Sequence, residues 1–454
     1  MKQKRPYPIL AVSKKAERSI LGGHPWVYDT EIRQTAGMIT NGCLVDVVTS
    51  PAGSRQETAK SGCSESNGNN SNTTATGKYL GTGFYSEHSK IRVRLISRNA
   101  NDKFDAAFWE RRIRYAWEYR KTVMRDDIGC CRIIFGEADQ FPGLTVDRFN
   151  DILVTQTLSY GMELLKPVIF PLLYRVLTED GQTIRGIYER NDVSIRELEG
   201  LEQDKGWYPL GHAFPSSSIP ENKVFHSVSD GSDSNEGSCL TEITENGIVY
   251  QVDVENGQKT GFFLDQKYNR QAVARLAAGK RVLDCFTHTG SFALNAAKGG
   301  AAHVCAVDIS ESAIEMAKKN ARRNGLDDRM SFRVANVFDL LPQLEQSHEE
   351  KYDFIILDPP AFTKSRKTVN NAKKGYKEIN LRAMKLLPRG GYLATCSCSH
   401  FMPDELFIQM LHSAAADAGV QLRQIEARQQ APDHPILWNV PETDYLKFYL
   451  FQVI

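Results

Sequence analysis

The second half of the chain alternates between strand-like and helix-like segments, and this alternation limits the folds that it can adopt. From residue 241 onward, short runs rich in β-branched and aromatic residues are separated, in most cases, by longer segments with a helical period. The strand-like runs cover residues 281–286, 303–308, 331–334, 353–358, 392–397, 421–427 and 446–453. Parallel strands need helical crossovers, so the pattern predicts an α/β domain with a doubly wound sheet and a ligand crevice at the carboxyl ends of its strands.

Details within this domain support the same interpretation. Ser310 is a candidate N-cap, and Gly325 a candidate glycine just beyond the C-cap, for a helix between them. A proline-containing loop without a long helix joins the last two strands, so we expect them to pair antiparallel at one edge.

The first half of the chain has a different organisation. Short β-branched runs with turn residues between them predict a small, mostly β domain over residues 1–98. Residues 50–77 are rich in Ser, Asn, Gly and Thr and predict a disordered insertion within a lengthened hairpin loop of that domain. A central α+β domain is expected over residues 99–213, with helices at 103–125 and 161–177. A low-complexity linker over 214–240 then leads to the domain over 241–454.

Composition excludes several classes of protein. The 454 residues include 56 Lys plus Arg against 55 Asp plus Glu, so any basic surface must be local. The sequence contains no run of 18 apolar residues, so no membrane-spanning helix is expected. The nine cysteines contain no CxxC pair, so neither a disulfide framework nor a zinc site is expected. We therefore expect a cytoplasmic protein without a metal.

The turn after the first strand of the α/β domain carries one glycine where a nicotinamide site needs three. Gly290 alone cannot cradle a pyrophosphate, but it suffices for a phosphate-free nucleoside ligand such as S-adenosylmethionine (SAM). Asp308 ends the next strand, where a carboxylate can accept both ribose hydroxyls. Asn336 follows the third strand, where its amide can match an adenine edge.

Each of these residues alone is better explained by a structural role, as a turn glycine, a helix-capping acid or a loop amide. Together, at successive strand ends, they favour a nucleoside cofactor. The candidate cofactor residues from this pattern are Asp284, Phe286, Gly290, Asp308, Asn336 and Asp358.

Two further strand ends carry candidate catalytic residues. The fourth strand ends in Asp358-Pro359-Pro360, and the prolines cannot continue a central strand, so they stop the chain at the crevice. The fifth strand ends in the motif TCSCS. Neighbouring strands lie about 5 Å apart, so Asp358 should flank the same cleft as Cys396 and Cys398. Cys398 lies further toward the crevice, whereas a buried structural role is expected for Cys396 and for Cys285 and Cys305.

A cysteine beside a methyl donor has a specific use. Thiolate addition at carbon 6 of a pyrimidine turns carbon 5 into a nucleophile, and a carboxyl group near ring nitrogen 3 stabilises the developing charge. Cys398 suits the first role and Asp358 the second, while no residue is assigned to the base that removes the carbon 5 hydrogen.

At this point the sequence resembles a known family over nearly its whole length: the bacterial large-subunit ribosomal RNA cytosine 5-methyltransferases of the RlmI-like group. The matching blocks are GGHPWVYDTEI, RNDVSIRELEGLE, GQKTGFFLDQKYNR, VLDCFTHTGSFALNAA, DPPAF, GYKEINLRAMKLL and TCSCS. The resemblance implies a PUA-like RNA-binding domain, a central α+β domain and a class I SAM-methyltransferase domain. It places the nucleophile on Cys398, and it implies further cofactor contacts from Lys259, Thr260, Phe262, Asp265 and Gln266.

This chain departs from the family pattern at two positions. Ala361 stands where the family usually has Lys, so a charge near the substrate is missing or supplied elsewhere. Asn336 stands where the family commonly has Asp, which weakens the adenine assignment.

A basic segment follows the fourth strand. Residues 359–377 contain no acid, and as a loop beside the catalytic strand they could hold phosphates around a target base. The candidate RNA-binding residues are Lys364, Arg366, Lys367, Lys373, Lys374 and Lys377. The expected partner is ribosomal RNA in a single-stranded or locally melted form, because a thiol must reach carbon 6 from above the ring plane. The oligomeric state is open, and a homodimer is one candidate.

Three other functions compete with the cytosine enzyme. A purine methyltransferase acting on an amino or ring nitrogen uses an acid-Pro-Pro-aromatic motif and needs no thiol, so it predicts that Cys398→Ala retains activity. A non-catalytic RNA-binding assembly factor predicts tight RNA binding without methyl incorporation. Small-molecule methylation leaves the PUA-like domain and the basic segment without a purpose.

Overall fold

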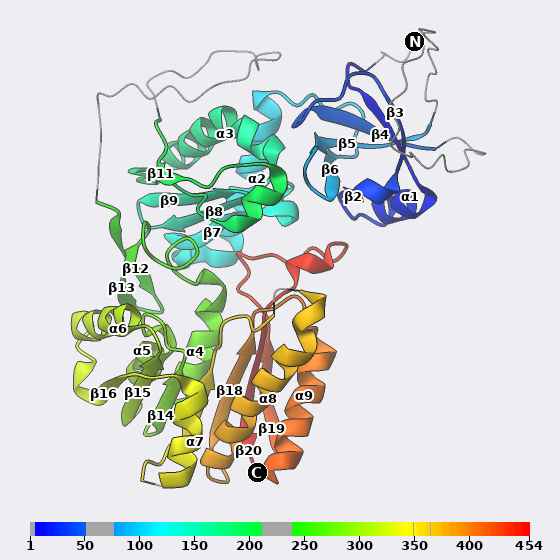
Figure 1. Ribbon diagram of the computed structural model, residues 1–454. Helices are drawn as coiled ribbons and strands as arrows, with labels where there is room; N and C mark the ends of the chain where they lie inside the picture. Colours follow the sequence, from blue (N-terminus) through cyan, green and yellow to red (C-terminus); the bar gives the residue numbers. More distant parts are fainter. Residues whose placement is uncertain (1–4, 51–76, 211–237, 348, 364) are drawn as a thin grey trace. The chain divides into compact units, whose positions relative to one another are not determined.

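The computed structural model describes residues 5–50, 77–210, 238–347, 349–363 and 365–454 (Figure 1). The chain forms two compact units, one of residues 1–125, 132–239 and 437–441 and the other of residues 126–131, 240–436 and 442–454. Nearly all of the predicted insertion at 50–77 and most of the predicted linker at 214–240 lie outside the described residues. The domain boundaries expected from the sequence stay predictions.

The first unit begins with a six-stranded sheet that carries one short helix. Its strand order is β2-β6-β5-β4-β1-β3, and β4 pairs antiparallel with β5 across the gap at residues 51–76, as expected for a lengthened hairpin. The elements are β1 (Ile9–Val12), α1 (Lys14–Leu21), β2 (Trp26–Tyr28), β3 (Ile32–Ala36), β4 (Leu44–Thr49), β5 (Tyr79–Tyr85) and β6 (Ile91–Ser97). Ser13 begins α1 as its N-cap.

The first unit also contains a five-stranded sheet in the order β11-β10-β9-β8-β7 with two long helices. Its elements are α2 (Ala106–Met124), β7 (Cys130–Phe135), β8 (Leu144–Phe149), β9 (Ile152–Thr157), α3 (Tyr160–Glu179), β10 (Gly186–Arg190) and β11 (Lys205–Trp207). β7 begins in the segment that the division into units assigns to the second unit. Trp109 and Trp117 of α2 are buried, so the aromatic residues of this helix mainly serve the core.

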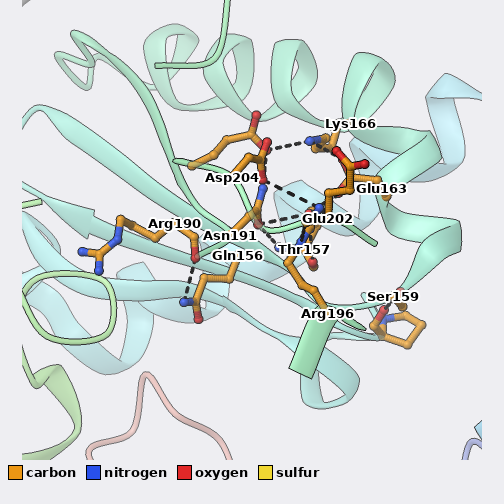
Figure 2. Close-up of polar contacts among 12 residues, drawn as sticks. Gln156, Thr157, Ser159, Glu163, Lys166, Arg190, Asn191, Arg196, Glu202 and Asp204 are labelled. Atoms are coloured by element: carbon orange, nitrogen blue, oxygen red, sulfur yellow. Dashed lines mark hydrogen bonds and ion pairs between the residues drawn. The ribbon is translucent and has the colours of Figure 1, made fainter. Parts of the chain in front are cut away.

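A network of buried charges holds α3 and the segment after β10 to this sheet (Figure 2). Lys166 contacts Glu163 at 2.5 Å and Glu189 at 2.7 Å. Arg196 donates to the carbonyl of Thr157 at 2.6 Å and to the carboxylate of Glu163 at 3.0 Å. These four charged residues and Thr157, here called the central network, satisfy one another's charges and hydrogen-bonding groups in a largely buried position.

The second unit is built on a seven-stranded sheet in the order β16-β15-β14-β17-β18-β20-β19. Its strands are β14 (Arg281–Cys285), β15 (His303–Asp308), β16 (Met330–Val334), β17 (Phe354–Leu357), β18 (Tyr392–Ser397), β19 (Leu422–Arg428) and β20 (Lys447–Val453). All seven predicted strands are present. β20 pairs antiparallel with both β18 and β19, which confirms the expected antiparallel edge.

Helices connect these strands as the alternating pattern predicts. They are α4 (Lys267–Leu276), α5 (Ser291–Lys298), α6 (Glu311–Arg323), α7 (Val337–Ser347), α8 (Val369–Leu386) and α9 (Asp404–Ala418), preceded by the hairpin of β12 (Leu240–Glu245) and β13 (Ile248–Asp253). Residues of α7, α8 and α9 pack with the sheet in one hydrophobic cluster. Ser310 caps α6, and Gly325 follows its end with a φ of 61°, as predicted.

One expectation about local structure is wrong. The basic segment 359–377 was expected to be a loop, but α8 begins at Val369 and includes Lys373, Lys374 and Lys377. Burial of Ala372, Tyr376 and Ile379 shows why, since this spacing extends the apolar face of the helix toward its N-terminus.

Candidate functional site

The parallel strands of the second unit bring the predicted site residues to one edge of the sheet. Cys285 is paired with both Val307 and Leu357, and Leu357 is paired with Thr395. The residues that follow these positions are therefore neighbours. They are Phe286 after β14, Asp308 at the end of β15, Asp358 after β17, and Cys396 near the end of β18 with Cys398 just beyond it.

The turn between β14 and α5 has a constrained backbone. Phe286 and His288 have φ values of 65° and 50°, and Gly290 has a φ of 85°. Positive φ at two residues other than glycine costs conformational energy and is concentrated at functional sites. A Cβ added at Gly290 would lie 3.0 Å from the Cβ of Ala317, so the turn also requires a residue without a side chain there.

Asp284 lies beneath this turn. Its Oδ2 accepts hydrogen bonds from the Thr287 hydroxyl at 2.6 Å and from the Ala293 amide at 2.9 Å. Within the described part of the chain, its buried Oδ1 has no hydrogen-bond partner. Burial, with a further contribution from the charge of Asp358, raises the pKa of Asp284 to about 7.

Asp308 is oriented by the backbone. Its two carboxylate oxygens accept the amides of His288 and Ser310, each at 2.9 Å. Each oxygen keeps a further lone pair, so the carboxylate can still accept hydroxyl groups from a ribose. Next to it, Ile309 is 70% exposed.

Asn336 has a local structural role. Its side-chain oxygen accepts the amide of Phe338 at the start of α7, and its carbonyl accepts the amide of Leu340. The expected contact with an adenine edge stays a prediction. Phe338 and Ile309, which the sequence reasoning missed, are exposed apolar side chains at this same edge. Apolar residues just after two strand ends could have been recognised in the sequence as candidate contacts for a flat ligand.

The segment 259–266 contributes buried side chains and one exposed lysine. Thr260, Phe262, Asp265 and Gln266 are each less than 5% exposed, while Lys259 is exposed and has a φ of 53°. The Lys259 ammonium lies 4.7 Å from the centre of the Phe263 ring.

Asp265 and Gln266 of this segment face other parts of the site. Asp265 accepts the hydroxyl of Tyr445 at 2.6 Å. Gln266 donates from Nε2 to Oδ1 of Asp358 at 2.9 Å.

Asp358 and the two cysteines form one electrostatic group. Burial raises the pKa of Asp358 to about 6, and the neighbouring Asp265 adds to this effect while Arg270 opposes it. Cys396 is fully buried and its thiol bonds to Asp358, whereas Cys398 is partly exposed. This is the difference in depth expected from the sequence.

Cys398 is in the thiol form at neutral pH. Burial raises the pKa of its thiol to about 11, and the positive charge of Lys259 works against this rise. The backbone next to Cys398 is held in place, because the buried ammonium of Lys447 donates a hydrogen bond to the carbonyl of Ser399 at 2.8 Å. Cys285 and Cys305 are buried within strands, as expected for structural cysteines.

The predicted RNA-binding residues are only partly visible. Lys364 and the side chain of Arg366 lie outside the described residues. Lys367 and Lys374 are exposed, Lys373 is partly exposed, and Lys377 forms an ion pair with Asp417 at 2.6 Å. Their role in RNA binding stays a prediction.

The part of the chain that the structure describes has neither a metal-binding cluster nor a membrane-spanning helix. Residues 5–50, 77–210, 238–347, 349–363 and 365–454 contain no cluster of three or more His, Cys, Asp or Glu side chains placed to hold a metal ion. Among the helices that the structure describes, none has the length and apolarity needed to span a membrane.

The residues at this edge fit a nucleoside cofactor that carries no phosphate. The buried Oδ1 of Asp284 and Oγ1 of Thr289 have no hydrogen-bond partners within the described chain, so polar capacity is left over at the turn. The tight approach at Gly290 and the oriented carboxylate of Asp308 add the backbone surface and the acceptor that such a ligand needs.

Comparisons with known proteins agree with this arrangement. The family of S-adenosylmethionine-dependent methyltransferases matches residues 230–452, and a PUA-like domain matches residues 10–53 and 72–98. A protein of Klebsiella pneumoniae named "Ribosomal RNA large subunit methyltransferase I" is 35% identical over 99% of both chains. The protein of that name from Erwinia tasmaniensis is 36% identical over 98% of this chain and 99% of its own.

A solved structure shows the same fold. A protein from Streptococcus mutans, described as a candidate SAM-dependent methyltransferase, has a TM-score of 0.72 at 20% identity and covers 98% of this chain and 99% of its own. The expected fold, a class I SAM-methyltransferase sheet preceded by a PUA-like domain, and the expected cofactor SAM are thereby confirmed.

Proposed function

The chain belongs to the family of SAM-dependent ribosomal RNA large subunit methyltransferases I, and from this premise we propose that it methylates carbon 5 of a cytosine in large-subunit ribosomal RNA through a covalent cysteine adduct. The observation that carries the proposal is the position of Cys398. It is a partly exposed thiol at the cofactor edge of the sheet, in electrostatic contact with both Asp358 and Lys259.

Residues at this edge of the sheet have separate roles in binding the cofactor and in activating the thiol. Asp308 and the turn at Gly290 hold the nucleoside part of SAM, which when bound supplies a methyl group on a sulfonium. Lys259 favours the thiolate of Cys398, which opposes the effect of burial. The thiolate forms a bond to carbon 6 of cytosine, and the electron pair displaced through the ring is taken up at nitrogen 3.

Asp358 acts on nitrogen 3. With a pKa of about 6 it is protonated in part of the molecules near neutral pH and can donate its proton as the adduct forms. Carbon 5 would then take the methyl group from the sulfonium that bound SAM supplies, with the sulfur–methyl bond breaking and its electron pair staying on the sulfur of the departing thioether. A base removes the carbon 5 proton, the carbon 5–carbon 6 double bond re-forms, the thiolate leaves, and the proton at nitrogen 3 returns to Asp358.

The RNA is held outside this cleft. The PUA-like domain and the exposed Lys367 and Lys374 are suited to phosphate contacts that position a flipped or single-stranded base. This division of labour supports an RNA substrate over a free small molecule, which would need neither feature.

The test is to incubate the protein with labelled SAM and large-subunit ribosomal RNA and to digest the product to nucleosides. Wild type should place label in 5-methylcytosine, and Cys398→Ser should lose it by at least a thousandfold. Cys43→Ser, a change at another partly exposed free thiol, is the matched control and should keep the activity. RNA containing 5-fluorocytidine should form a stable covalent complex with wild type only, because fluorine blocks the final elimination.

Other outcomes would replace the proposal. Label in a purine would identify a nitrogen methyltransferase. Tight RNA binding without label would identify a non-catalytic assembly factor. A covalent complex that survives Cys398→Ser and is lost in Cys396→Ser would move the nucleophile to the buried cysteine.

A further inference from the structure

A chain of hydrogen bonds leads to Asp358 from three residues that are distant in sequence. Arg428, the last residue of β19, donates from Nε to Oδ1 of Asn269 at 3.1 Å. Asn269 on α4 donates from Nδ2 to Oε1 of Gln266 at 2.6 Å. Gln266 donates from Nε2 to Oδ1 of Asp358 at 2.9 Å. Both amide side chains are nearly inaccessible, with 3% of Gln266 and 1% of Asn269 exposed.

The direction of this chain follows from the chemistry of its first member. A guanidinium group only donates hydrogen bonds, so the side-chain atom of Asn269 that faces Arg428 must be its oxygen. The amide nitrogen of Asn269 then faces Gln266 and must meet an oxygen there. The nitrogen of Gln266 is left to face Asp358, so the orientation of both amides is determined without observing hydrogens.

We propose that Gln266 is a positioning residue, which holds Oδ1 of Asp358 as a hydrogen-bond acceptor, so that Oδ2 carries the proton exchanged with the substrate. The Cys396 thiol is the other side-chain group hydrogen-bonded to this carboxyl. This inference rests on the proposed function, because it concerns how Asp358 protonates nitrogen 3 of the cytosine. It differs from the cofactor contact that the family resemblance implies for Gln266. The balance of the step is unchanged: Oδ2 gives its proton to nitrogen 3 as the sulfur–carbon bond forms and regains it when the thiolate leaves.

The hydrogen bond from Gln266 also lowers the pKa of Asp358, against the effect of burial. Burial is the largest influence and raises the pKa of this carboxyl, and Asp265 raises it further, whereas Arg270, the Cys396 thiol and the Gln266 amide lower it. The titratable and charged groups that face Asp358 from the neighbouring elements are Asp265, Arg270, Asp284, Tyr376, Cys396 and Cys398.

The decisive variant reverses the chain without changing Gln266 or Asp358. In Asn269→Asp both side-chain oxygens accept, so Gln266 turns its nitrogen toward position 269 and its oxygen toward Asp358. The carbonyl of Gln429 also loses the hydrogen bond that Nδ2 of Asn269 donates to it at 3.3 Å. Asp358 then keeps a proton on Oδ1, bonded to Gln266, and its pKa rises. We expect the alkaline limb of the pH–rate profile to move up by about one pH unit or more and the maximal rate to fall about tenfold or more.

Three further variants separate positioning from mere support of the fold. Gln266→Met removes the hydrogen bond to Asp358 without adding a charge, so it should move the limb in the same direction by a smaller amount. Arg428→Lys is still a pure donor and should keep the wild-type limb. Asn324→Asp changes an asparagine of the same unit that bonds to Val249 and Asn320 and has no contact with this chain, so it should leave the limb in place.

A readout without substrate keeps this inference separate from the proposed function. In protein labelled with carbon-13 at aspartate carboxyl groups, the resonance that disappears in Asp358→Asn belongs to Asp358, and its pH titration gives the pKa directly. The titration should shift upward in Asn269→Asp and stay in place in Asn324→Asp, with SAM affinity unchanged in both.

The outcomes are distinct. An unshifted titration in Asn269→Asp, or a rate that falls equally at every pH, would overturn the positioning role even if 5-methylcytosine is formed. A shifted titration in a protein that makes no 5-methylcytosine would leave the role of Gln266 standing and overturn the proposed function.

Discussion

The protein contains two buried groups of charge that differ in how they are compensated. In the central network (Figure 2), Lys166 forms ion pairs with both Glu163 and Glu189, and Arg196 forms one with Glu163. At the cofactor edge of the second unit, the buried Asp284 and the partly buried Asp358 lie near each other, and neither has a direct ion pair among the described residues.

The pKa values reflect this difference. Burial raises the pKa of Glu163, but Lys166, Thr157 and Arg196 outweigh it and the net pKa is lowered. Burial dominates at Asp284 and Asp358, whose pKa values rise to about 7 and about 6. Glu189 is intermediate, since its pKa is raised by burial although Lys166 lies beside it. Paired charges such as Glu163 therefore stabilise the fold. Acids without a paired cation, such as Asp284 and Asp358, have raised pKa values, which are typical of groups that transfer protons at catalytic sites.

The largest expected effect comes from removing the carboxyl group of Asp358. Asp358→Asn keeps an oxygen that can accept the Gln266 amide but cannot donate a carboxyl proton, so methyl transfer should fall by about 100- to 10,000-fold. The loss should appear in the single-turnover rate with labelled SAM, with SAM affinity retained. Full activity in this variant would place Asp358 among the structural charges and remove the contrast between the two regions.

The next effect concerns stability. Lys166→Met removes the cation that pairs with the buried Glu189 and leaves the partly buried Glu163 with Arg196 alone, so we expect the free energy of unfolding to fall by about 3–5 kcal/mol. Urea denaturation measures it. The matched control is Lys318→Met, which removes an exposed pair with Glu315 and should cost less than about 1 kcal/mol. Equal costs in the two variants would show that the central network contributes no more than a surface pair.

The pH dependence of stability gives the third test. The folded pKa of Asp358, about 6, exceeds the usual value of 3.8, so the folded state binds its proton more tightly than the unfolded state. Asp358 therefore costs stability as the pH rises from about 4 to about 6, by at most about 3 kcal/mol. Asp358→Asn should be more stable than wild type at pH 8, and this gain should vanish below pH 4. A gain that is constant with pH would contradict the raised pKa.

Much of the fold was predictable because its signals are local. The seven strands of the large sheet appear as short β-branched runs, and Ser310 and Gly325 mark the ends of α6 by their own conformational preferences. The start of α8 was missed because charged residues obscure the buried positions Ala372 and Tyr376. The short strand β11 was not predicted, because it is formed by backbone pairing with β10 and its three residues show no strand pattern in the sequence.

The site was predictable only in part, and for a related reason. Strand ends are visible in the sequence, so Asp308, Asp358 and Cys398 could be found. The partner of Asp358 could not, since Gln266 lies 92 residues away and Asn269 lies 159 residues from Arg428. The positive φ of Phe286 is likewise imposed by the surrounding fold, because a bulky aromatic residue rarely adopts it and gives no such signal in the sequence.

The smallest expected effect tests how the cleft tunes its thiol. Burial raises the pKa of Cys398, and Lys259 is the group that lowers it most, so Lys259→Met should reduce the thiolate fraction further. Alkylation of Cys398 by iodoacetamide at pH 8, followed by mass spectrometry of the labelled peptide, should slow by about three- to tenfold. Lys280→Met is the matched control, because Lys280 also lies 4.7 Å from an aromatic ring centre, that of Tyr392, without acting on Cys398. If both variants react at the wild-type rate, Lys259 does not lower the pKa of the Cys398 thiol. The thiol would then lack a compensating cation, as Asp284 and Asp358 do, and would have to be activated by the bound substrate.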